Sequence, residues 1–297
     1  MQDRQLSRAE AVHKKGLLIT FIGGLLLTFD TPLIRLADSD QWTVMFWRSG
    51  FTVYAILLFW SFRAGTGRYV APLVNGWNGV VTGLCYALAN ICFVIALSHT
   101  SVANVVFMLA LNPLFAALFS FIWLRERLAW ETAAALFVSF AGAMIIVWEG
   151  LSIGSTMGDL LALAASVVSG FSLTVIRRSR LDLSMTPGLG TLFPLVFSCF
   201  FITSTTFQLG ADQFVWLLLD GLIIVPIAAG LLLLGPRYIT AAEVGMFFLL
   251  ETVLAPIWVW LVVSEEPSKG SIIGGAVILV TLALHSFMRL QRSRQGA

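Results

Sequence analysis

Asp30, Arg48 and Glu251 each lie inside a run of about 20 apolar residues, long enough to cross a bilayer. A charge at the middle of a membrane costs several kcal/mol unless it pairs, reaches the headgroups or faces water. Ionisable residues in such runs usually mark solute pathways or proton relays. These three residues are therefore the first candidates for binding or proton chemistry.

Asp30 and Arg48 are expected to form an ion pair. Asp30 lies six residues before the end of the stretch 16–36, and Arg48 lies six residues after the start of 42–62. At about 1.5 Å per residue both are about 9 Å inside the same membrane boundary. A short linker joins the stretches, which makes neighbouring helices the expectation. Two interpretations stay open: a fixed pair that locks two helices, and a gate whose arginine exchanges partners or binds a carboxylate.

Glu251 lies at the middle of the stretch 240–262, one turn before Pro256. An unpaired glutamate there is expected to be protonated, or to be kept charged by a cation or a partner. We predict that it binds a solute or a proton. The alternative is a neutral acid hydrogen-bonded to a carbonyl that Pro256 leaves free. Glu243 lies eight residues earlier, near the end of the helix, where a solvated position and a place in the pathway are both open.

Asn112 lies at the depth of Glu251 in another apolar stretch, 101–123, and Asn104 precedes it by eight residues. Inward-facing polar groups on two such helices would line a shared cavity at mid-membrane. The alternative is hydrogen bonding between helices, which is common for asparagine in membranes.

Tyr86 and Asn90 are one turn apart and share one helical face, so they are further candidates for the pathway. Trp47 could supply an aromatic wall for an organic ligand, although contact with lipid would also explain it.

The composition requires membrane helices to position these residues. The chain is 58% hydrophobic and 11% charged, with a mean hydropathy of +0.90, which excludes an ordinary soluble domain. A net charge of +2 without a basic patch gives no reason to expect a nucleic-acid partner. We predict an all-α integral membrane protein with helices at 16–36, 42–62, 76–97, 101–123, 129–148, 158–176, 187–208, 213–234, 240–262 and 270–288.

Motifs for other chemistries are missing from the sequence. Cys85, Cys92 and Cys199 all lie in apolar stretches, so a disulfide framework is not expected. The three histidines are scattered and predict no metal site, and we expect no cofactor. Neither a Walker A sequence nor an HExxH or GxSxG motif occurs, so we expect neither direct ATP coupling nor an enzyme.

Basic residues predict the orientation. Fifteen of the 18 lysines and arginines fall in the segments 1–15, 63–75, 124–128, 177–186, 235–239 and 289–297. The positive-inside rule then places both termini in the cytoplasm of a multi-pass protein in the plasma membrane, the inner membrane in a bacterium.

The chain also repeats itself. Residues 100–147 align with 240–287, and Glu126 then coincides with Glu266 in the hinge between two apolar stretches. Residues 16–37 align with 158–179, where both segments carry small residues at helical spacing. We predict two repeats, 16–148 and 158–288, flanked by an N-terminal tail, 1–15, and a basic tail, 289–297. Five helices in each repeat give the two repeats opposite orientations in the bilayer.

Four segments carry a resemblance to a known family: TFDTPLIRLA, FWRSG, TSVANVVFMLALNPLFAALFSFIWLRERL and ETVLAPIWVWLVVSEEPS. The chain resembles the EamA-type transporters of the drug/metabolite transporter superfamily, which have ten helices in two inverted repeats. Helix kinks are expected at Pro32, Pro113 and Pro256, and those of the fourth and ninth helices should not be symmetric, because Val253 and not Pro256 aligns with Pro113.

The resemblance implies secondary active transport, often export, of a small organic metabolite that is amino-acid-like or amphipathic. The inverted repeats predict alternating access around a cavity at mid-membrane, with protons as a candidate coupling ion. A functional monomer in the lipid bilayer is expected. A membrane-embedded enzyme and a passive channel remain the alternatives.

Overall fold

The computed structural model describes residues 2–66, 72, 74–125, 130–179, 186–234, 238 and 241–295. Within these ranges every regular element is helical. The helices of the first half are α1 (Gln2–Leu27), α2 (Asp30–Ala37), α3 (Gln41–Gly65), α4 (Gly76–His99), α5 (Val102–Leu109), α6 (Asn112–Leu124) and α7 (Trp130–Ile153). The helices of the second half are α8 (Thr156–Ser179), α9 (Thr186–Ser198), the short 3₁₀ helices η1 (Cys199–Phe201) and η2 (Ser204–Phe207), α10 (Ala211–Leu218), the π-helical η3 (Leu219–Ile224), α11 (Val225–Leu234), α12 (Ala241–Val263) and α13 (Lys269–Gln295).

Ten apolar helices of the described chain match the ten predicted stretches, which confirms the predicted fold class. Six are long and apolar enough to cross a membrane: His13–Ala37, Gln41–Gly65, Gly76–His99, Val102–Leu124, Thr156–Ile176 and Ala211–Leu232. Four are shorter: Ala133–Glu149, Gly190–Phe201, Leu250–Val263 and Lys269–His285. Helix α1 begins at Gln2 and α13 ends at Gln295, so most of each predicted tail extends a membrane helix. Glu126 of the predicted hinge lies outside the described residues.

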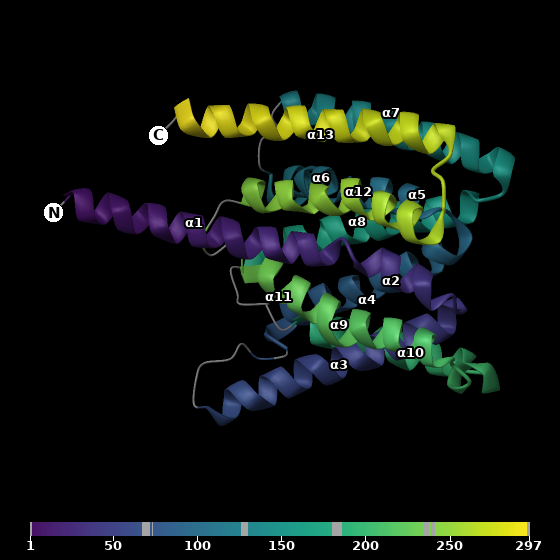
Figure 1. Ribbon diagram of the computed structural model, residues 1–297. Coiled ribbons are helices and arrows are strands. Elements are labelled where there is room, and N and C mark those ends of the chain that lie inside the picture. Colours follow the sequence, from purple (N-terminus) through teal and green to yellow (C-terminus); the bar gives the residue numbers. More distant parts are fainter. Residues whose placement is uncertain are drawn as a thin grey trace.

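Both chain ends lie at one end of the helical bundle, which we call the terminal face (Figure 1). The opposite end, which we call the distal face, carries the connection between α2 and α3 and the connection between α12 and α13 (Figure 1). Because the first half crosses the bundle five times, the second half begins at the distal face. The two halves therefore run through the bundle in opposite senses.

Contacts between the halves come in matched pairs. Helix α4 packs against α8, and α11, the counterpart of α4 in the second half, packs against α1, the counterpart of α8. In the same way α6 packs on α8 and α12 packs on α1. The equivalent helices α3 and α9 contact each other, as do α7 and α13. This pattern is expected for two repeats related by a two-fold axis.

Small residues at the aligned positions allow these close approaches. A Cβ added to Gly24 of α1 would lie 2.9 Å from the carbonyl oxygen of Phe247 in α12. A Cβ added to Gly170 of α8 would lie 2.6 Å from the Cβ of Phe115 in α6. Both glycines thus lie where a helix of one half crosses a helix of the other at close range.

Several membrane helices are interrupted near the candidate residues. The first is broken between α1 and α2 at Thr28–Phe29, and the fourth between α5 and α6 at Ala110–Leu111. Pro32 and Pro113 follow these breaks within the first turn of the next helix, where proline is tolerated. Pro256 instead lies inside α12, which continues through it. The fourth and ninth helices therefore differ, as the displaced proline predicts.

Candidate functional site

Arg48 of α3 lies at the centre of a buried cluster of charges. Its Nη2 atom donates to both carboxylate oxygens of Asp30, at 2.9 and 2.8 Å, and its Nε atom donates to Oδ2 of Asp220 at 2.8 Å. The three residues are only 3%, 5% and 0% exposed, respectively. The predicted contact between Asp30 and Arg48 is present, and a second carboxylate, from the other half of the chain, completes it.

Local irregularities bring the two acids to the arginine. Asp30 opens the short helix α2 directly after the break in the first membrane helix. Asp220 lies in the π-helical turns of η3, next to Gly221. A Cβ on Gly221 would lie 2.5 Å from the carbonyl oxygen of Arg48, so the glycine allows η3 to approach α3 closely. Thr52 donates to the carbonyl oxygens of both Arg48 and Gly221 at 2.9 Å, which joins the two helices beside the cluster.

Asp220 is not among the residues predicted from the sequence, although a usable signal was present. Asp220 lies seven residues inside the predicted helix 213–234, and the high cost of a charge in the bilayer applies to it as it does to Glu251. Its partner could not be found in this way, because α3 and η3 belong to opposite halves of the chain.

Two of the predicted site residues and one ring surround the cluster. Glu251 of α12 interacts electrostatically with Asp30 and Arg48, and Tyr86 of α4 interacts with all three charged residues of the cluster. The guanidinium carbon of Arg48 lies 5.7 Å from the centre of the Phe93 ring, within the range of a cation–π contact. Glu251 retains partial exposure, unlike the three residues of the cluster. The structure thus brings together acids from both halves, one arginine and a tyrosine.

Among the buried polar atoms without a hydrogen-bond partner in the described structure are three oxygens of Asp220, Asn90 and Asn112. They are Oδ1 of Asp220, Oδ1 of Asn90 and Oδ1 of Asn112. A buried acceptor without a donor costs about 1–3 kcal/mol, so such atoms are uncommon in folded proteins. Asn90 shares a face of α4 with Tyr86, while Asn112 begins α6 at the break in the fourth helix. Each of these oxygens can accept a hydrogen bond that the described structure does not supply.

Two other predicted pathway residues, Asn104 and Trp47, lie outside the cluster. Asn104 belongs to a separate polar network near the distal face. Trp47 donates through Nε1 to the carbonyl oxygen of Thr206 at 2.9 Å and packs among phenylalanines that include Phe51 and Phe214. This aromatic packing accounts for Trp47 without a ligand. The side chain of Glu243 lies outside the described residues.

The network that holds Asn104 centres on Asp159 of α8, which is fully buried. Oδ1 of Asp159 accepts from Thr100 Oγ1 at 2.6 Å and from Asn104 Nδ2 at 2.8 Å, and Oδ2 accepts from Ser155 Oγ at 3.2 Å. Ser271 of α13 donates to the other side of the Asn104 amide. The network therefore joins the α4–α5 junction of the first half to two helices of the second. We call it the distal network.

An ion pair adjoins this network. Nε of Arg35 lies 3.1 Å from Oε2 of Glu265, and Nη2 of Arg35 donates to the carbonyl oxygen of Thr100 at 2.7 Å. Oε1 of Glu265 accepts from the backbone amide of Val102 at 2.7 Å. The end of α2 is thereby tied to the start of α5 and to the α12–α13 connection.

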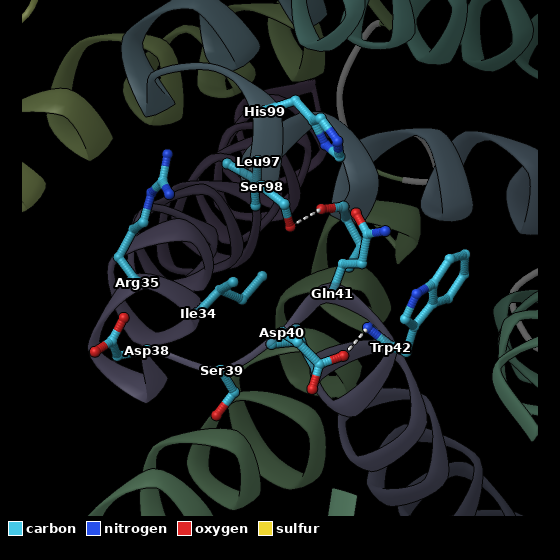
Figure 2. A pocket seen from close by; sticks show the side chains of 12 residues that line it. Ile34, Arg35, Asp38, Ser39, Asp40, Gln41, Trp42, Leu97, Ser98 and His99 are labelled. Carbon is cyan, nitrogen blue, oxygen red and sulfur yellow. Dashed lines mark hydrogen bonds between the residues drawn. The ribbon is translucent and has the colours of Figure 1, made fainter. Parts of the chain in front are cut away.

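A cavity of about 410 Å³ opens beside the end of α2 (Figure 2). It lies between α2, the start of α3 and the end of α4. Arg35, Asp38, Gln41 and His99 are among the residues that line it (Figure 2). Asp40, also in its wall, caps α3 by accepting from the amide of Trp42 at 2.9 Å (Figure 2). This cavity, which we call the distal vestibule, has a mixed polar and aliphatic lining.

Comparisons with known proteins place the chain among membrane carriers. The family model described as "EamA-like transporter family" matches residues 14–148 and 156–287. An uncharacterized transporter of Synechocystis sp. is 24% identical over 217 residues, which cover 67% of this chain and 62% of that relative. The pseudopaline exporter of Pseudomonas aeruginosa is 25% identical over 301 residues, which cover 95% of this chain and 98% of the exporter.

A solved crystal structure shares the fold. It superposes with a TM-score of 0.63 at 16% identity and covers 92% of this chain and 99% of the other. At this level of identity the likeness concerns the fold alone.

Proposed function

The chain belongs to the EamA-like transporter family, and on that premise we propose that it exports a small organic solute by secondary active transport. The two halves alternate in opening the cluster around Arg48 to one side of the membrane and then to the other. One observation carries the proposal. The buried arginine is held by an acid from each half, so any relative movement of the halves changes its partners.

The balance of charge in the site favours a solute with a cationic group. Asp30, Asp220 and Glu251 are three carboxyl groups, and Arg48 is the one cation of the group. Buried carboxylates in excess of their partners are costly, so the site gains stability by taking up a proton or an ammonium group. Arg48 can in turn bind a carboxylate with two parallel hydrogen bonds. An amino-acid-like solute carries both groups.

Protons are the proposed coupling ion. The titratable and charged groups of the site come from five elements: Asp30 on α2, Arg48 on α3, Tyr86 on α4, Asp220 on η3 and Glu251 on α12. A proton taken up by one of the acids would release the guanidinium from it. Exchange of protons for solute would then couple export to the proton gradient.

Three further features of the proposal are the membrane orientation, the direction of transport and the oligomeric state. We place both termini in the cytoplasm of a plasma-membrane protein. Most lysines and arginines lie in the two tails and in the segments that the sequence predicts on the same side of the membrane as the tails. The name of the Pseudomonas relative, an exporter, supports outward movement. A monomer is sufficient, because the two halves of one chain complete the site.

Counterflow in proteoliposomes tests this function. Vesicles are loaded with candidate amino-acid-like solutes, and exchange of labelled solute is followed with and without a pH gradient. Saturable counterflow that responds to the gradient is expected. Flux that neither saturates nor exchanges would identify a channel, and a chemically altered solute would identify an enzyme.

Glu251→Gln is the site variant for this assay, with Glu266→Gln as the control because Glu266 is an exposed acid of the α12–α13 connection. We expect the Glu251 variant to lose its response to the pH gradient and the control to keep it. A Glu251 variant that transports normally at every pH would remove Glu251 from the site.

A further inference from the structure

Three helices next to the distal vestibule share one order of residues. On α2 and its cap, Asp30, Ile34 and Asp38 follow each other at intervals of four residues. On α3 and its cap the same spacing joins Arg48, Val44 and Asp40, here running against the chain direction. On α4, the positions are Asn90, Val94 and Ser98. Residues four apart lie on the same helical face, so each helix presents a central polar residue, then an aliphatic residue, then a polar residue of the vestibule.

The middle layer consists of Ile34, Val44 and Val94, which we call the aliphatic plug. All three line the vestibule, and they are 7%, 2% and 1% exposed. One helical turn separates this layer from the polar residues on the inner side, which corresponds to about 6 Å along the helix axis. The plug therefore forms the floor of the vestibule, and the buried charges lie directly beneath it.

We propose that the aliphatic plug is the distal gate of the transport pathway, and that the vestibule is the passage through which the solute leaves. This inference rests on the proposed function. An apolar constriction resists hydration and so blocks ions and polar solutes while it is closed. Three tightly packed aliphatic groups keep protons and water in the vestibule from the charge cluster.

The surroundings of Ile34 indicate which part moves. Helix α2 has eight residues and lies between the break at Thr28–Phe29 and the cap at Asp38, whose φ of 39° is left-handed. Both ends of α2 are thus points where the backbone can change direction. The Arg35–Glu265 pair holds this short helix against the second half. Release of that pair would let α2 swing outward and carry Ile34 away from Val44 and Val94.

Cysteine labelling tests the gate without any solute. In a background with the three native cysteines replaced, a single cysteine is introduced by Asn90→Cys below the plug or by His99→Cys in the vestibule. A membrane-impermeant methanethiosulfonate reagent is applied to sealed vesicles on the side from which the His99 position reacts. We expect the position below the plug to react much more slowly than the vestibule position.

Truncation of the plug should open the path. Val44→Ala and Val94→Ala are each expected to accelerate labelling of the Asn90 position about tenfold, since removing two methyl groups lowers the cost of hydrating the constriction. Val105→Ala is the matched control, because Val105 is a fully buried valine of α5 that does not line the vestibule. Val44→Thr keeps the side-chain shape but places a hydroxyl in the constriction, so it should also accelerate labelling and supplies a second test if the alanine variants fold poorly.

The outcomes separate the gate from the transport activity. The proposed gate is contradicted if, with the plug intact, the Asn90 position below it reacts as fast as the His99 position in the vestibule. It is equally wrong if Val105→Ala matches the plug variants, or if the plug variants change nothing. A protein that moves no solute but shows the expected labelling would overturn the proposed function and leave the closed plug in place.

Discussion

The charge cluster and the distal network are both buried groups of polar residues that join the two halves, yet they are built differently. In the distal network both oxygens of Asp159 accept hydrogen bonds, and the donors Thr100, Asn104 and Ser155 are neutral. In the charge cluster Arg48 donates hydrogen bonds to two acids, Asp30 and Asp220, and Oδ1 of Asp220 has no donor in the described structure.

This difference suggests separate roles. A fully satisfied buried network makes the structure rigid, because every alternative arrangement loses a hydrogen bond. A cluster with surplus acids and a spare acceptor is more stable when a further cation or donor joins it. We therefore propose that the distal network contributes stability and that the charge cluster exchanges solute or protons. Asn104, predicted as a pathway residue, is then reinterpreted as a structural one.

The largest expected effect is that of Arg48→Ala. Without Arg48 the two buried acids lose their shared cation, so we expect at least about a 100-fold fall in transport, in addition to the stability cost of about 3–5 kcal/mol for breaking a buried ion pair. Arg48→Lys should recover only part of the rate, because lysine cannot bind two acids with a planar fork. Solute counterflow per folded molecule is the measurement.

Arg63→Ala, at the end of the same helix, is the control and should transport normally. If Arg48→Ala lowered the melting temperature but left transport per folded molecule intact, Arg48 would be structural and the contrast between the two regions would disappear.

Gly221→Ala should have the next largest effect. The new Cβ would meet the Arg48 carbonyl at 2.5 Å, so η3 must move away from α3 and carry Asp220 with it. We expect about a tenfold loss of transport because Asp220 is displaced from Arg48, and separately a stability loss of about 1–3 kcal/mol from overpacking. Gly230→Ala in α11 is the matched control, because nothing lies within 4 Å of a Cβ there. Equal transport by both variants would show that the approach of Asp220 is not needed.

The smallest effect on transport is expected for Asp159→Asn. The amide turns one acceptor into a donor toward groups that already donate, which should cost about 1–3 kcal/mol of stability. The melting temperature in detergent should fall while transport per folded molecule stays unchanged. A variant with normal stability and impaired transport would instead place the distal network in the pathway.

The comparison also shows where prediction from sequence succeeded. Asp30 and Arg48 could be paired because the linker between their helices is short and each lies equally far from the same boundary. Asp220 could have been flagged by its depth in the membrane. Its partner could not, because the contact between η3 and α3 joins distant segments of the chain. The functional roles of Glu251, Asn112, Asn90 and Tyr86 stay predictions.

The sequence by itself determined the ten membrane helices, since each is encoded by its own run of apolar residues, and the two repeats, since their features recur in order. Only the tertiary structure decided which face of each helix meets which neighbour. As a result, Arg48 donates to Asp220, Asn104 donates to Asp159, and Ile34, Val44 and Val94 line the vestibule together. The physical reason is that hydrophobicity is a property of each segment, whereas packing in a bilayer depends on close fit between segments far apart in the chain.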